Sequence, residues 1–561
     1  MSNRPQNQET DSSVSRRGFI KTASAAVAAG AAVGSIAATE DAAVAAPKPL
    51  PAGGGISREQ QAFDVRVQAA QLQLDASTGL PLQEANGDEE RYADQAYYAS
   101  FTKTLPHNKI GEVDSSAYEA LIAAADSGDP ADYDAVPLDK TAGRKLANPQ
   151  GALRFTYVGL DGHATRMPAA PTIRSAEAAG EMAEVYWLAV TRNVPFAQYR
   201  LNPLIREAVV DLNRFSVTPG FNDRVISRTL FRGETVGDVL GPYVSQFLLK
   251  DIPYGPTTII QKYIEPATFY MADDANWLNI LRGGSPLEKA VFEEDFKYIY
   301  NNNVLAEYVH TDVLFQAYFN ALLIGLSFPG AVDVTNPYAN STNQGGFTSG
   351  GGPWFIDMLT QVANLALNSA WYHKWNVHRR LRPEVMAGRI HHHLMGNAKY
   401  ELNDEIFDSP VLDILLEQNG TYYLPMGFIE GSPTHPSYPA GHATVAGACC
   451  TILKAVFNED YEIPDPVVAS SDGSALLAYN GRPLKIGNEI NKLASNVTLG
   501  RDAAGVHYRS DGVLGNVIGE RQALGVLQEY SLALNEEFDG FQLTKFDGTE
   551  IMIQNGVITE I

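Results

Sequence analysis

The chain has 561 residues, of which 45 % are hydrophobic and 19 % charged, so it can bury a sizeable core, and the composition excludes bulk disorder. Its formal net charge of -23 argues against nucleic acid as a partner, because phosphate binding needs a basic face. The only two cysteines, Cys449 and Cys450, are adjacent, and neighbouring cysteines rarely bridge each other comfortably. We therefore expect them to be small buried residues on a helix.

The N-terminal segment is typical of a twin-arginine export signal. Arg16 and Arg17 lie in Ser-Arg-Arg-Gly-Phe-Ile-Lys, an alanine-rich apolar stretch follows, and small residues suited to cleavage lie near Ala45. The apolar run is too short and too rich in alanine to favour a membrane helix, and no later segment resembles a membrane span. We predict a signal peptide over residues 1–46, a single large domain over 47–561, and a periplasmic or extracellular location.

Helical periodicity dominates the chain after a Pro/Gly-rich linker. Apolar residues recur at three- and four-residue intervals in four segments, namely 63–72, 176–190, 315–324 and 358–367. Residues 329–353 are rich in Gly, Asn, Ser and Pro, which predicts a long loop. Near the C-terminus, residues 541–553 alternate around Asp547-Gly548, which predicts a β-hairpin. These patterns predict a mainly α-helical fold, a large bundle with a few short β-hairpins.

The first cluster of chemical interest runs from Trp371 to Pro383 and concentrates one Lys, three Arg and two His at the end of an apolar helical pattern. Lys374, His378 and Arg382 are spaced by four, so they are expected to share one broad face near the helix end. Pro383 biases the residue before it out of the helix. A solvated surface is the alternative interpretation, but the two tryptophans and the abrupt stop favour an anion pocket.

The second cluster runs from Ser432 to His442 and contains three prolines, followed at once by a helix-forming run of small residues. The free N–H groups at a helix start, together with the helix dipole, favour an anion. Gly441 lets the backbone approach such an anion closely. His442 is then placed beside the anion, where a histidine can act as acid or base.

The third cluster runs from Gly500 to Asp511. Arg501 can donate a fork of hydrogen bonds to two oxygens. His507 can present one ring nitrogen to a central atom, and Asp511, one helical turn further on, can hold the other N–H and fix the tautomer. A lone histidine is more often structural, but the ordered combination of the three clusters predicts one site for a tetrahedral oxyanion. Its residues are Lys374, Arg382, Gly441, His442, Arg501 and His507.

The order Lys-x7-Arg-Pro, Pro-x-Gly-His and Gly-Arg-x5-His-x3-Asp resembles the vanadium-dependent haloperoxidases, which share an oxyanion site with the type 2 phosphatidic acid phosphatase superfamily. Three segments look closest to the bromoperoxidases of red-algal and cyanobacterial type: His-Arg-Arg-Leu-Arg-Pro-Glu, Ser-Pro-Thr-His-Pro-Ser-Tyr-Pro and Lys-Phe-Asp-Gly-Thr. Close motif similarity covers roughly residues 371–512 and the tail. The resemblance implies two packed helical bundles and a homo-oligomer.

For the cofactor, the resemblance implies vanadate. Lys374, Arg382 and Arg501 would bind its oxygens, the backbone N–H of Gly441 would donate to it, and His507 would be the vanadium ligand.

For catalysis, the resemblance implies that His442 is the acid/base that handles hydrogen peroxide. His435 occupies a position where bromoperoxidases of this type also have His. The implied activity is oxidation of bromide or iodide, with chloride as a third candidate, to hypohalous acid, which then halogenates small organic acceptors.

Two positions depart from the family pattern or modify it. Ala440 stands where the family usually has Ser, and the missing hydroxyl removes a contact worth roughly 1–3 kcal/mol if made to a charged group. This predicts weaker vanadate binding or a changed halide preference. His373 immediately precedes Lys374 and lies near the proposed halide site, and we group His378 and Asp511 with it as residues that tune the site.

The main alternative is an exported acid phosphatase of the same superfamily, with His507 as nucleophile and His442 as general acid. The extra residue between Lys374 and Arg382, the His435-Pro-Ser-Tyr-Pro segment and the length of the soluble chain favour the peroxidase. A non-catalytic oxyanion-binding protein is a third hypothesis.

Two further features are candidate metal sites. Residues 391–393 are three adjacent histidines, which point in different directions on a helix and are expected in a supporting or core role. Acidic loop residues are candidates for a structural calcium, although no ligand spacing proves it.

Overall fold

The computed structural model describes residues 57–220 and 224–561, so the predicted signal peptide lies outside the described residues. Within them the chain is mainly helical, as the apolar periodicity predicts. The α-helices are α2 (Arg58–Ser77), α3 (Asp88–Arg91), α4 (Ser115–Ser127), α5 (Pro130–Ala135), α6 (Ala176–Thr191), α7 (Pro203–Leu212), α8 (Asp274–Leu281), α9 (Asn302–Tyr308), α10 (Gln316–Leu326), α11 (Gly352–Tyr372), α12 (Pro383–Leu394), α13 (Pro410–Asn419), α14 (Gly441–Val456), α15 (Ile486–Ala503) and α16 (Arg509–Ala533).

Shorter helical turns join these helices. The 3₁₀ turns are η1 (Ala93–Gln95), η2 (Pro149–Leu153), η3 (Gly162–Ala164), η4 (Phe196–Gln198), η6 (Gln246–Leu248) and η8 (Asp404–Ile406), and η7 (His373–His378) is a π-helix. The predicted loop over 329–353 contains no helix before α11 begins at Gly352.

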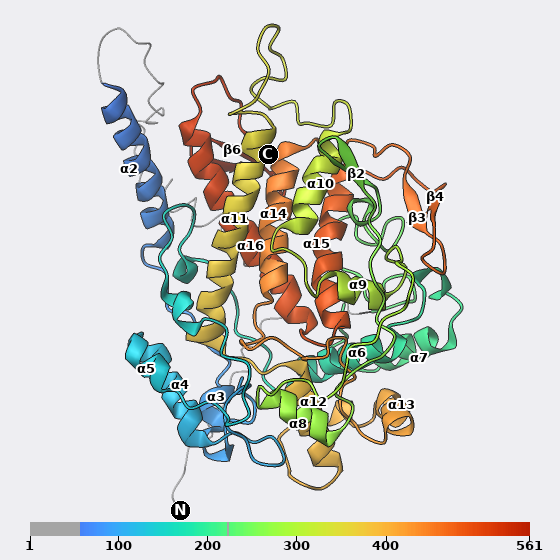
Figure 1. The fold of residues 1–561 in the computed structure, drawn as a ribbon. Coiled ribbons are helices and arrows are strands. Elements are labelled where there is room, and N and C mark those ends of the chain that lie inside the picture. The colour runs from blue at the N-terminus through green and yellow to red at the C-terminus, as the bar shows by residue number, and fades with distance from the viewer. Residues whose placement is uncertain (1–56, 221–223) are drawn as a thin grey trace, which may run out of the picture.

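Two groups of helices pack together, each around its own hydrophobic core (Figure 1). In the first group α14 is central and packs against α11, α15 and α16, with α10 beside them. In the second group α6 packs against α7, α12 and α13. The predicted helical-bundle fold is confirmed. Cys449 and Cys450 are buried in α14, also as expected.

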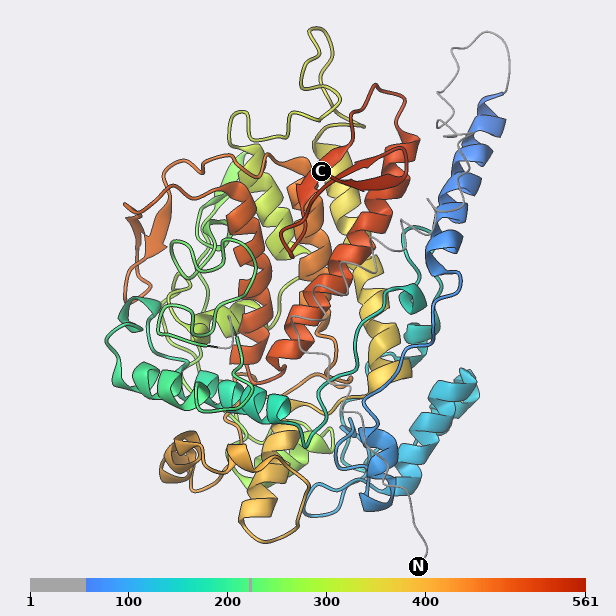
Figure 2. The ribbon, with the colours of Figure 1, turned by 180° about the vertical axis from the view of Figure 1, so that it is seen from behind.

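The strands are short and all antiparallel. They form the pairs β1 (Ile252–Tyr254) with β2 (Thr257–Ile259) and β3 (Val467–Ala469) with β4 (Leu476–Ala478), and the C-terminal sheet β5 (Phe541–Thr544), β6 (Glu550–Gln554) and β7 (Val557–Glu560). The predicted hairpin is β5–β6, in which Phe541 pairs with Ile553. Strand β7, which the alternation did not reveal, pairs with β6 and completes a small sheet that lies against α14 and α16 (Figure 2).

Helices α14 and α16 approach each other closely because small residues line their contact. A Cβ on Gly447 of α14 would lie 2.0 Å from the Asn516 carbonyl oxygen, and a Cβ on Gly519 of α16 would lie 2.0 Å from the Thr444 carbonyl oxygen. Only hydrogen atoms fit at these positions. The glycines therefore bring the starts of both helices together, and those starts carry the site residues described below.

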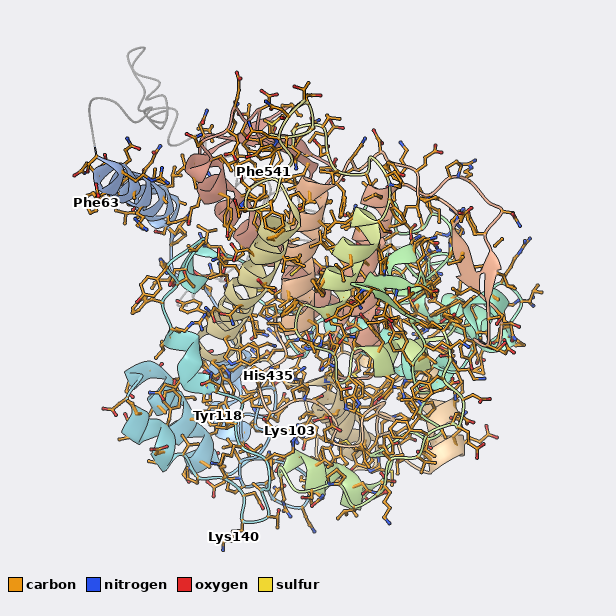
Figure 3. All side chains as sticks on the ribbon, turned by 45° about the horizontal axis from the view of Figure 1, so that its top comes forward. Phe63, Lys103, Tyr118, Lys140, His435 and Phe541 are labelled. Carbon is orange, nitrogen blue, oxygen red and sulfur yellow. The ribbon has the colours of Figure 1, made fainter. Side chains whose placement is uncertain are left out.

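Helix α2 lies at the edge of the first group, where it contacts α16. It has no buried residue, and Phe63 on it points away from the body of the molecule with 59 % of its surface exposed (Figure 3). No helix in the described ranges 57–220 and 224–561 is long and apolar enough to cross a membrane.

Gly519→Ala should lower the melting temperature, because the added methyl group would overlap the Thr444 carbonyl oxygen and the helix backbones would have to separate. Overpacking of this kind costs about 1–3 kcal/mol of unfolding free energy. The matched control is Gly525→Ala on the same helix, where the nearest atom lies 3.4 Å from the added methyl. Thermal unfolding of the two variants checks the prediction, and equal melting temperatures would contradict it.

Candidate functional site

The first cluster does not form one helix face. Helix α11 ends at Tyr372 and continues as the π-helix η7, and Arg379 then takes a left-handed backbone conformation with φ 33° that breaks the helix. Lys374 lies in the π-helix, whereas Arg382 lies beyond the break as the N-cap of α12. The prediction that Lys374, His378 and Arg382 share one helix face is therefore wrong. A π-turn widens the helix locally, and such turns are frequent at functional sites.

The side chain of Lys374 is fully buried and reaches the second cluster. Its Nζ donates to the carbonyl oxygens of Pro436 and Ser437, at 2.6 and 2.8 Å. The lysine therefore fixes the proline-rich turn as well as placing a charge beside it.

His378 and His373 lie beside the site, packed against each other rather than lined up with Lys374 and Arg382. Their rings stack at 5.6 Å, and the His378 ring also meets Tyr438 edge-on at 4.8 Å. Both are buried, and Nε2 of His373 contacts the Thr165 carbonyl oxygen. These two residues therefore pack beside the site, and His378 also interacts electrostatically with Arg380 and Asp511.

Arg382 is the central cation, because its guanidinium touches both of the other clusters. Its Nε donates to the His435 carbonyl oxygen at 3.0 Å and its Nη1 donates to the Val506 carbonyl oxygen at 2.7 Å. The same Nη1 lies 2.9 Å from His507 Nε2, and Nη2 lies 3.0 Å from His435 Nδ1. A guanidinium can only donate, so both ring nitrogens accept and carry lone pairs.

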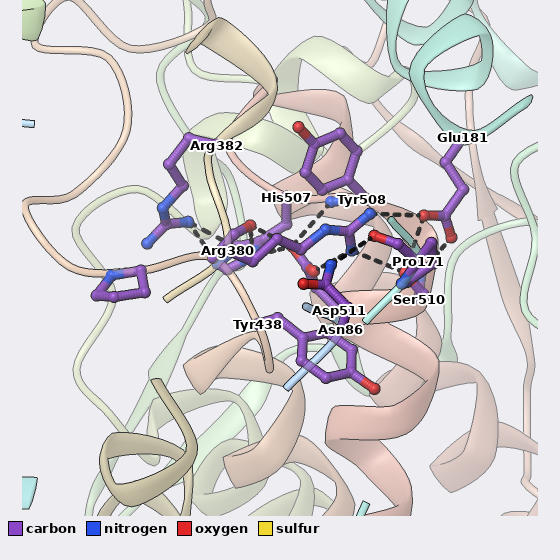
Figure 4. A network of polar contacts seen from close by, with 12 residues as sticks. Asn86, Pro171, Glu181, Arg380, Arg382, Tyr438, His507, Tyr508, Ser510 and Asp511 are labelled. Atoms are coloured by element: carbon purple, nitrogen blue, oxygen red, sulfur yellow. Dashed lines mark hydrogen bonds and ion pairs between the residues drawn. The ribbon is translucent and has the colours of Figure 1, made fainter. Parts of the chain in front are cut away.

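Asp511 holds the opposite side of the His507 ring (Figure 4). Its Oδ2 lies 2.9 Å from His507 Nδ1, the contact that the sequence spacing predicts. Asp511 also accepts from Arg380 Nη1 at 2.7 Å and from the Ser437 hydroxyl. These contacts hold the pKa of Asp511 well below its usual range despite its burial, so it is a carboxylate and Nδ1 of His507 carries the proton. The lone pair of His507 is therefore on Nε2, on the Arg382 side.

Arg501 comes from the last turn of α15 and is buried. Its Nη1 donates to the Val309 carbonyl oxygen, and its guanidinium lies 5.1 Å from the ring centroid of Phe428. Its Nε is buried and has no hydrogen-bond partner in the described part of the chain. A buried donor without a partner costs free energy, so this atom is suited to an acceptor supplied by a ligand.

His442 begins α14 as its second residue, and its Nε2 lies 2.9 Å from Asp312 Oδ1. Burial raises the pKa of Asp312, but His442 and Arg501 outweigh it, so the net pKa is lowered and Asp312 is charged. The hydrogen of His442 consequently lies on Nε2 and the lone pair on Nδ1. Burial and Arg501 lower the pKa of His442, against the effect of Asp312.

The start of α14 has backbone N–H groups that are suited to bind an anion. Ala440 is the N-cap with no side-chain cap, and its backbone N–H donates to the Asp511 carbonyl oxygen at 2.8 Å. The first-turn N–H groups that follow, beginning with Gly441, have no carbonyl one turn earlier to bind. They point toward the helix start, where an anion is favoured.

The pocket is short of negative charge. Burial lowers the pKa of Arg382 to about 9 and that of Arg501 to about 10. Burial, with Arg382 next to it, lowers the pKa of Lys374 well below the usual lysine value. For His507 and His435 as well, burial and the neighbouring cations hold the pKa well below the usual range. Each lowered pKa shows that the positively charged form of the group is disfavoured, so a bound anion would stabilise the charged form of every one of these groups. The residues present thus fit a tetrahedral oxyanion.

Reasoning from the sequence missed three contributors. Asp312 lies in a segment without a motif and reaches His442 only through the fold. Arg380 was counted among the arginines of the first cluster, and it pairs with Asp511 at 2.7 Å and with Glu181 at 3.1 Å. Ser437 lies within the second cluster, and no spacing in the sequence relates its hydroxyl to Asp511.

Comparisons with known proteins agree with this geometry. Residues 358–535 match the family model of the second helical-bundle domain of VCPO. A vanadium-dependent bromoperoxidase from Ascophyllum nodosum is 36 % identical over 531 residues, which cover 90 % of this chain and 94 % of that protein. The enzyme of the same description from Corallina pilulifera is 32 % identical over 605 residues, covering 90 % of this chain and all of that protein. The chain belongs to the vanadium-dependent bromoperoxidase family.

A solved structure supports the same assignment. The homohexameric second vanadate-dependent bromoperoxidase of Ascophyllum nodosum superposes with a TM-score of 0.82 at 29 % identity, over 93 % of this chain and 96 % of that one.

The remaining metal hypotheses gain no support. In residues 57–220 and 224–561 no group of three or more His, Cys, Asp or Glu side chains is placed to hold a metal ion, so structural calcium stays a prediction. His391 and His392 are buried, and His391 stacks on Tyr423 at 4.2 Å, which agrees with the expected core role.

Asp312→Asn should lower the pKa of His442 further, because it removes the negative charge that stabilises the imidazolium. On acidification His442 would then stay neutral to a lower pH than in the unaltered protein. NMR titration with ¹³C-labelled histidine checks this, with the His442 signal assigned through His442→Gln. Asp460→Asn, an exposed carboxylate paired with Lys485, is the control. A His442 pKa that rises or stays constant in Asp312→Asn would refute the predicted role of Asp312.

Proposed function

We propose that this protein binds vanadate and uses hydrogen peroxide to oxidise bromide or iodide, and also chloride if the halide site allows it, to hypohalous acid. The observation that carries the proposal is the buried set of Lys374, Arg382 and Arg501 around the lone pair of His507, with lowered pKa values that call for an anion. The named relatives, which align over nine-tenths of the chain, support a peroxidase over the phosphatase alternative.

Binding of vanadate is assigned to the chain's own donors. Lys374, Arg382 and Arg501 would neutralise its oxygens, and the first-turn N–H of Gly441 would donate to it. His507 Nε2 is the atom suited to hold vanadium, because Asp511 keeps the proton on Nδ1. Arg382 Nη1, which donates to Nε2 in the ligand-free protein, would then donate to a vanadate oxygen instead. When bound, the vanadate supplies a Lewis acid that makes a peroxide oxygen electrophilic toward halide.

Proton handling is assigned to His442. Its Nδ1 carries the lone pair, so this atom can take a proton from hydrogen peroxide and return it to the oxygen that leaves with the halogen. Asp312 orients the ring and makes the charged form less costly. His435, held by Arg382 and packed 4.6 Å from Trp371, lies where it can tune the neighbouring guanidinium.

The product is small, so the enzyme need not hold the organic acceptor that hypohalous acid halogenates.

Two further parts of the proposal concern the assembly and the location of the whole protein. The homohexameric relative supports a homo-oligomer, and the twin-arginine motif supports export to the periplasm or beyond. Size-exclusion chromatography with light scattering and a signal-peptide reporter test the two separately.

Halogenation of a dione dye by purified protein should require hydrogen peroxide, halide and orthovanadate together, and phosphate should suppress it. Lys374→Met should weaken vanadate binding in equilibrium dialysis roughly 10- to 100-fold, since a hydrogen bond to a charged group is worth about 1.5–3 kcal/mol. The matched control is Lys109→Met, a change to an exposed lysine.

A parallel assay with p-nitrophenyl phosphate separates the alternatives. Ester hydrolysis that vanadate inhibits, without halogenation, would show a phosphatase and overturn the proposal. Vanadate binding with turnover of neither substrate would show an oxyanion-binding protein and would also overturn it.

Ala440→Ser should strengthen vanadate binding about tenfold or more, because the new hydroxyl would lie at the N-cap of α14 beside the oxyanion. Ser is also a favoured N-cap residue, so the variant should fold. Ala440→Gly, which caps acceptably but adds no hydroxyl, is the control. Equilibrium dialysis of vanadate provides the affinities, and the halide series shows any change in preference. An unchanged affinity and halide ranking in Ala440→Ser would contradict the prediction.

A further inference from the structure

A second cavity lies away from the oxyanion pocket and shares no lining residue with it. Its volume is about 510 Å³, which is within the range of sites for small organic molecules. The walls come from the segment around η4, from residues 227–249, from Tyr300 and from strand β3, on the side of the molecule that carries β3 and β4 (Figure 1). Halide and peroxide are far too small to need such a space.

The charge of this cavity is opposite to that of the protein. Arg200, Arg228 and Arg232 line it, and its lining includes no acidic residue, although the chain as a whole has a net charge of -23. Asp238 and Glu489 lie behind Arg232 and offset part of its charge. Arg200 and Arg228 form no ion pair with any described residue, and both are exposed. Arg228 donates to the Val239 carbonyl oxygen through Nε and Nη2, at 3.3 and 2.9 Å, and this neutral partner leaves its charge uncancelled. The cavity therefore presents two guanidinium charges that no carboxylate matches.

Aromatic rings form the rest of the recognition surface. Phe196 and Tyr243 stack with their centroids 3.8 Å apart and their planes within 9°, and the Arg232 guanidinium lies 5.3 Å from the Tyr243 ring. Tyr199 and Tyr300 also line the cavity. Aromatic side chains beside guanidinium groups match a ligand that combines a planar ring with a carboxylate.

We propose that this cavity is a binding site for a small aromatic carboxylate, with the ring against the stacked Phe196–Tyr243 pair and the carboxylate on Arg200 and Arg228. Because a guanidinium binds a carboxylate through two parallel hydrogen bonds, Arg200 would supply orientation as well as charge. Arg228, whose Nε and Nη2 donate to Val239, would contribute mainly charge. The site is separate from the oxyanion pocket, so the proposal does not depend on halide oxidation. It gives the protein a place for an organic anion that the proposed chemistry alone does not need.

The test is calorimetric titration of the full protein with 4-hydroxybenzoate, in the presence of a slight molar excess of orthovanadate to fill the oxyanion pocket. One-to-one binding is expected, and uncharged 4-hydroxybenzyl alcohol should bind roughly tenfold more weakly or worse, because it cannot form the charged hydrogen bonds. Cyclohexanecarboxylate, which has the charge without the aromatic ring, should also bind more weakly.

Variants then locate the ligand. Arg200→Gln removes a side chain with no hydrogen bond in the described part of the chain, so it should fold, and it should weaken 4-hydroxybenzoate binding about tenfold. Phe196→Leu should weaken it through loss of the stacked ring. The matched control is Arg66→Gln, a change to an exposed arginine on α2, which should leave the affinity unchanged.

Three results would overturn the proposal: no saturable binding, equal affinity for the carboxylate and the alcohol, or displacement of the probe by orthovanadate. An equal effect of Arg200→Gln and Arg66→Gln would show attraction to surface charge in general, and would overturn it as well. None of these results bears on vanadate-dependent halogenation, which is measured separately.

Discussion

The site depends on one buried carboxylate, Asp511, which joins three segments that are distant in sequence. Its side chain accepts from Arg380 in the first cluster, from Ser437 in the second and from His507 in the third. Its backbone carbonyl oxygen accepts from the N–H of Ala440, at the start of α14. Because these contacts exist within the protein itself, the His507 ring and the start of α14 are held in place before any ligand arrives.

The cations around the site fall into two groups, according to whether their partners are carboxylates or neutral carbonyl oxygens. The outer cations are matched by carboxylates of α6: Arg380 pairs with Glu181, and Arg509 pairs with Glu184 at 2.5 Å. The inner cations, Lys374 and Arg382, donate mainly to neutral carbonyl oxygens. Carbonyl dipoles position a cation without cancelling its charge. The outer cations are therefore neutralised within the protein, whereas the charges of Lys374 and Arg382 favour a bound anion.

Much of this could be predicted from the sequence, and the failures have physical causes. Local periodicity predicted α6, α10 and α11, and turn chemistry predicted the β5–β6 hairpin, because these patterns act over a few residues. The four-residue spacing in the first cluster misled because it assumes a regular α-helix, whereas η7 is a π-helix and Arg379 breaks it. Asp312 reaches His442 across 130 residues of chain, a contact that only the fold creates. Strand β7 has too little alternation to be distinguished from an exposed tail.

The close approach of α14 and α16 also fixes how far apart the two helix starts lie. Gly515 brings α16 so near α14 that a Cβ on it would lie 2.9 Å from the Ala443 Cβ and 3.1 Å from the Ala440 carbonyl oxygen. The two helix starts consequently cannot move closer together or adapt to a smaller guest. An anion bound at these helix starts therefore meets donors whose separation is set by the helix packing and not by the anion.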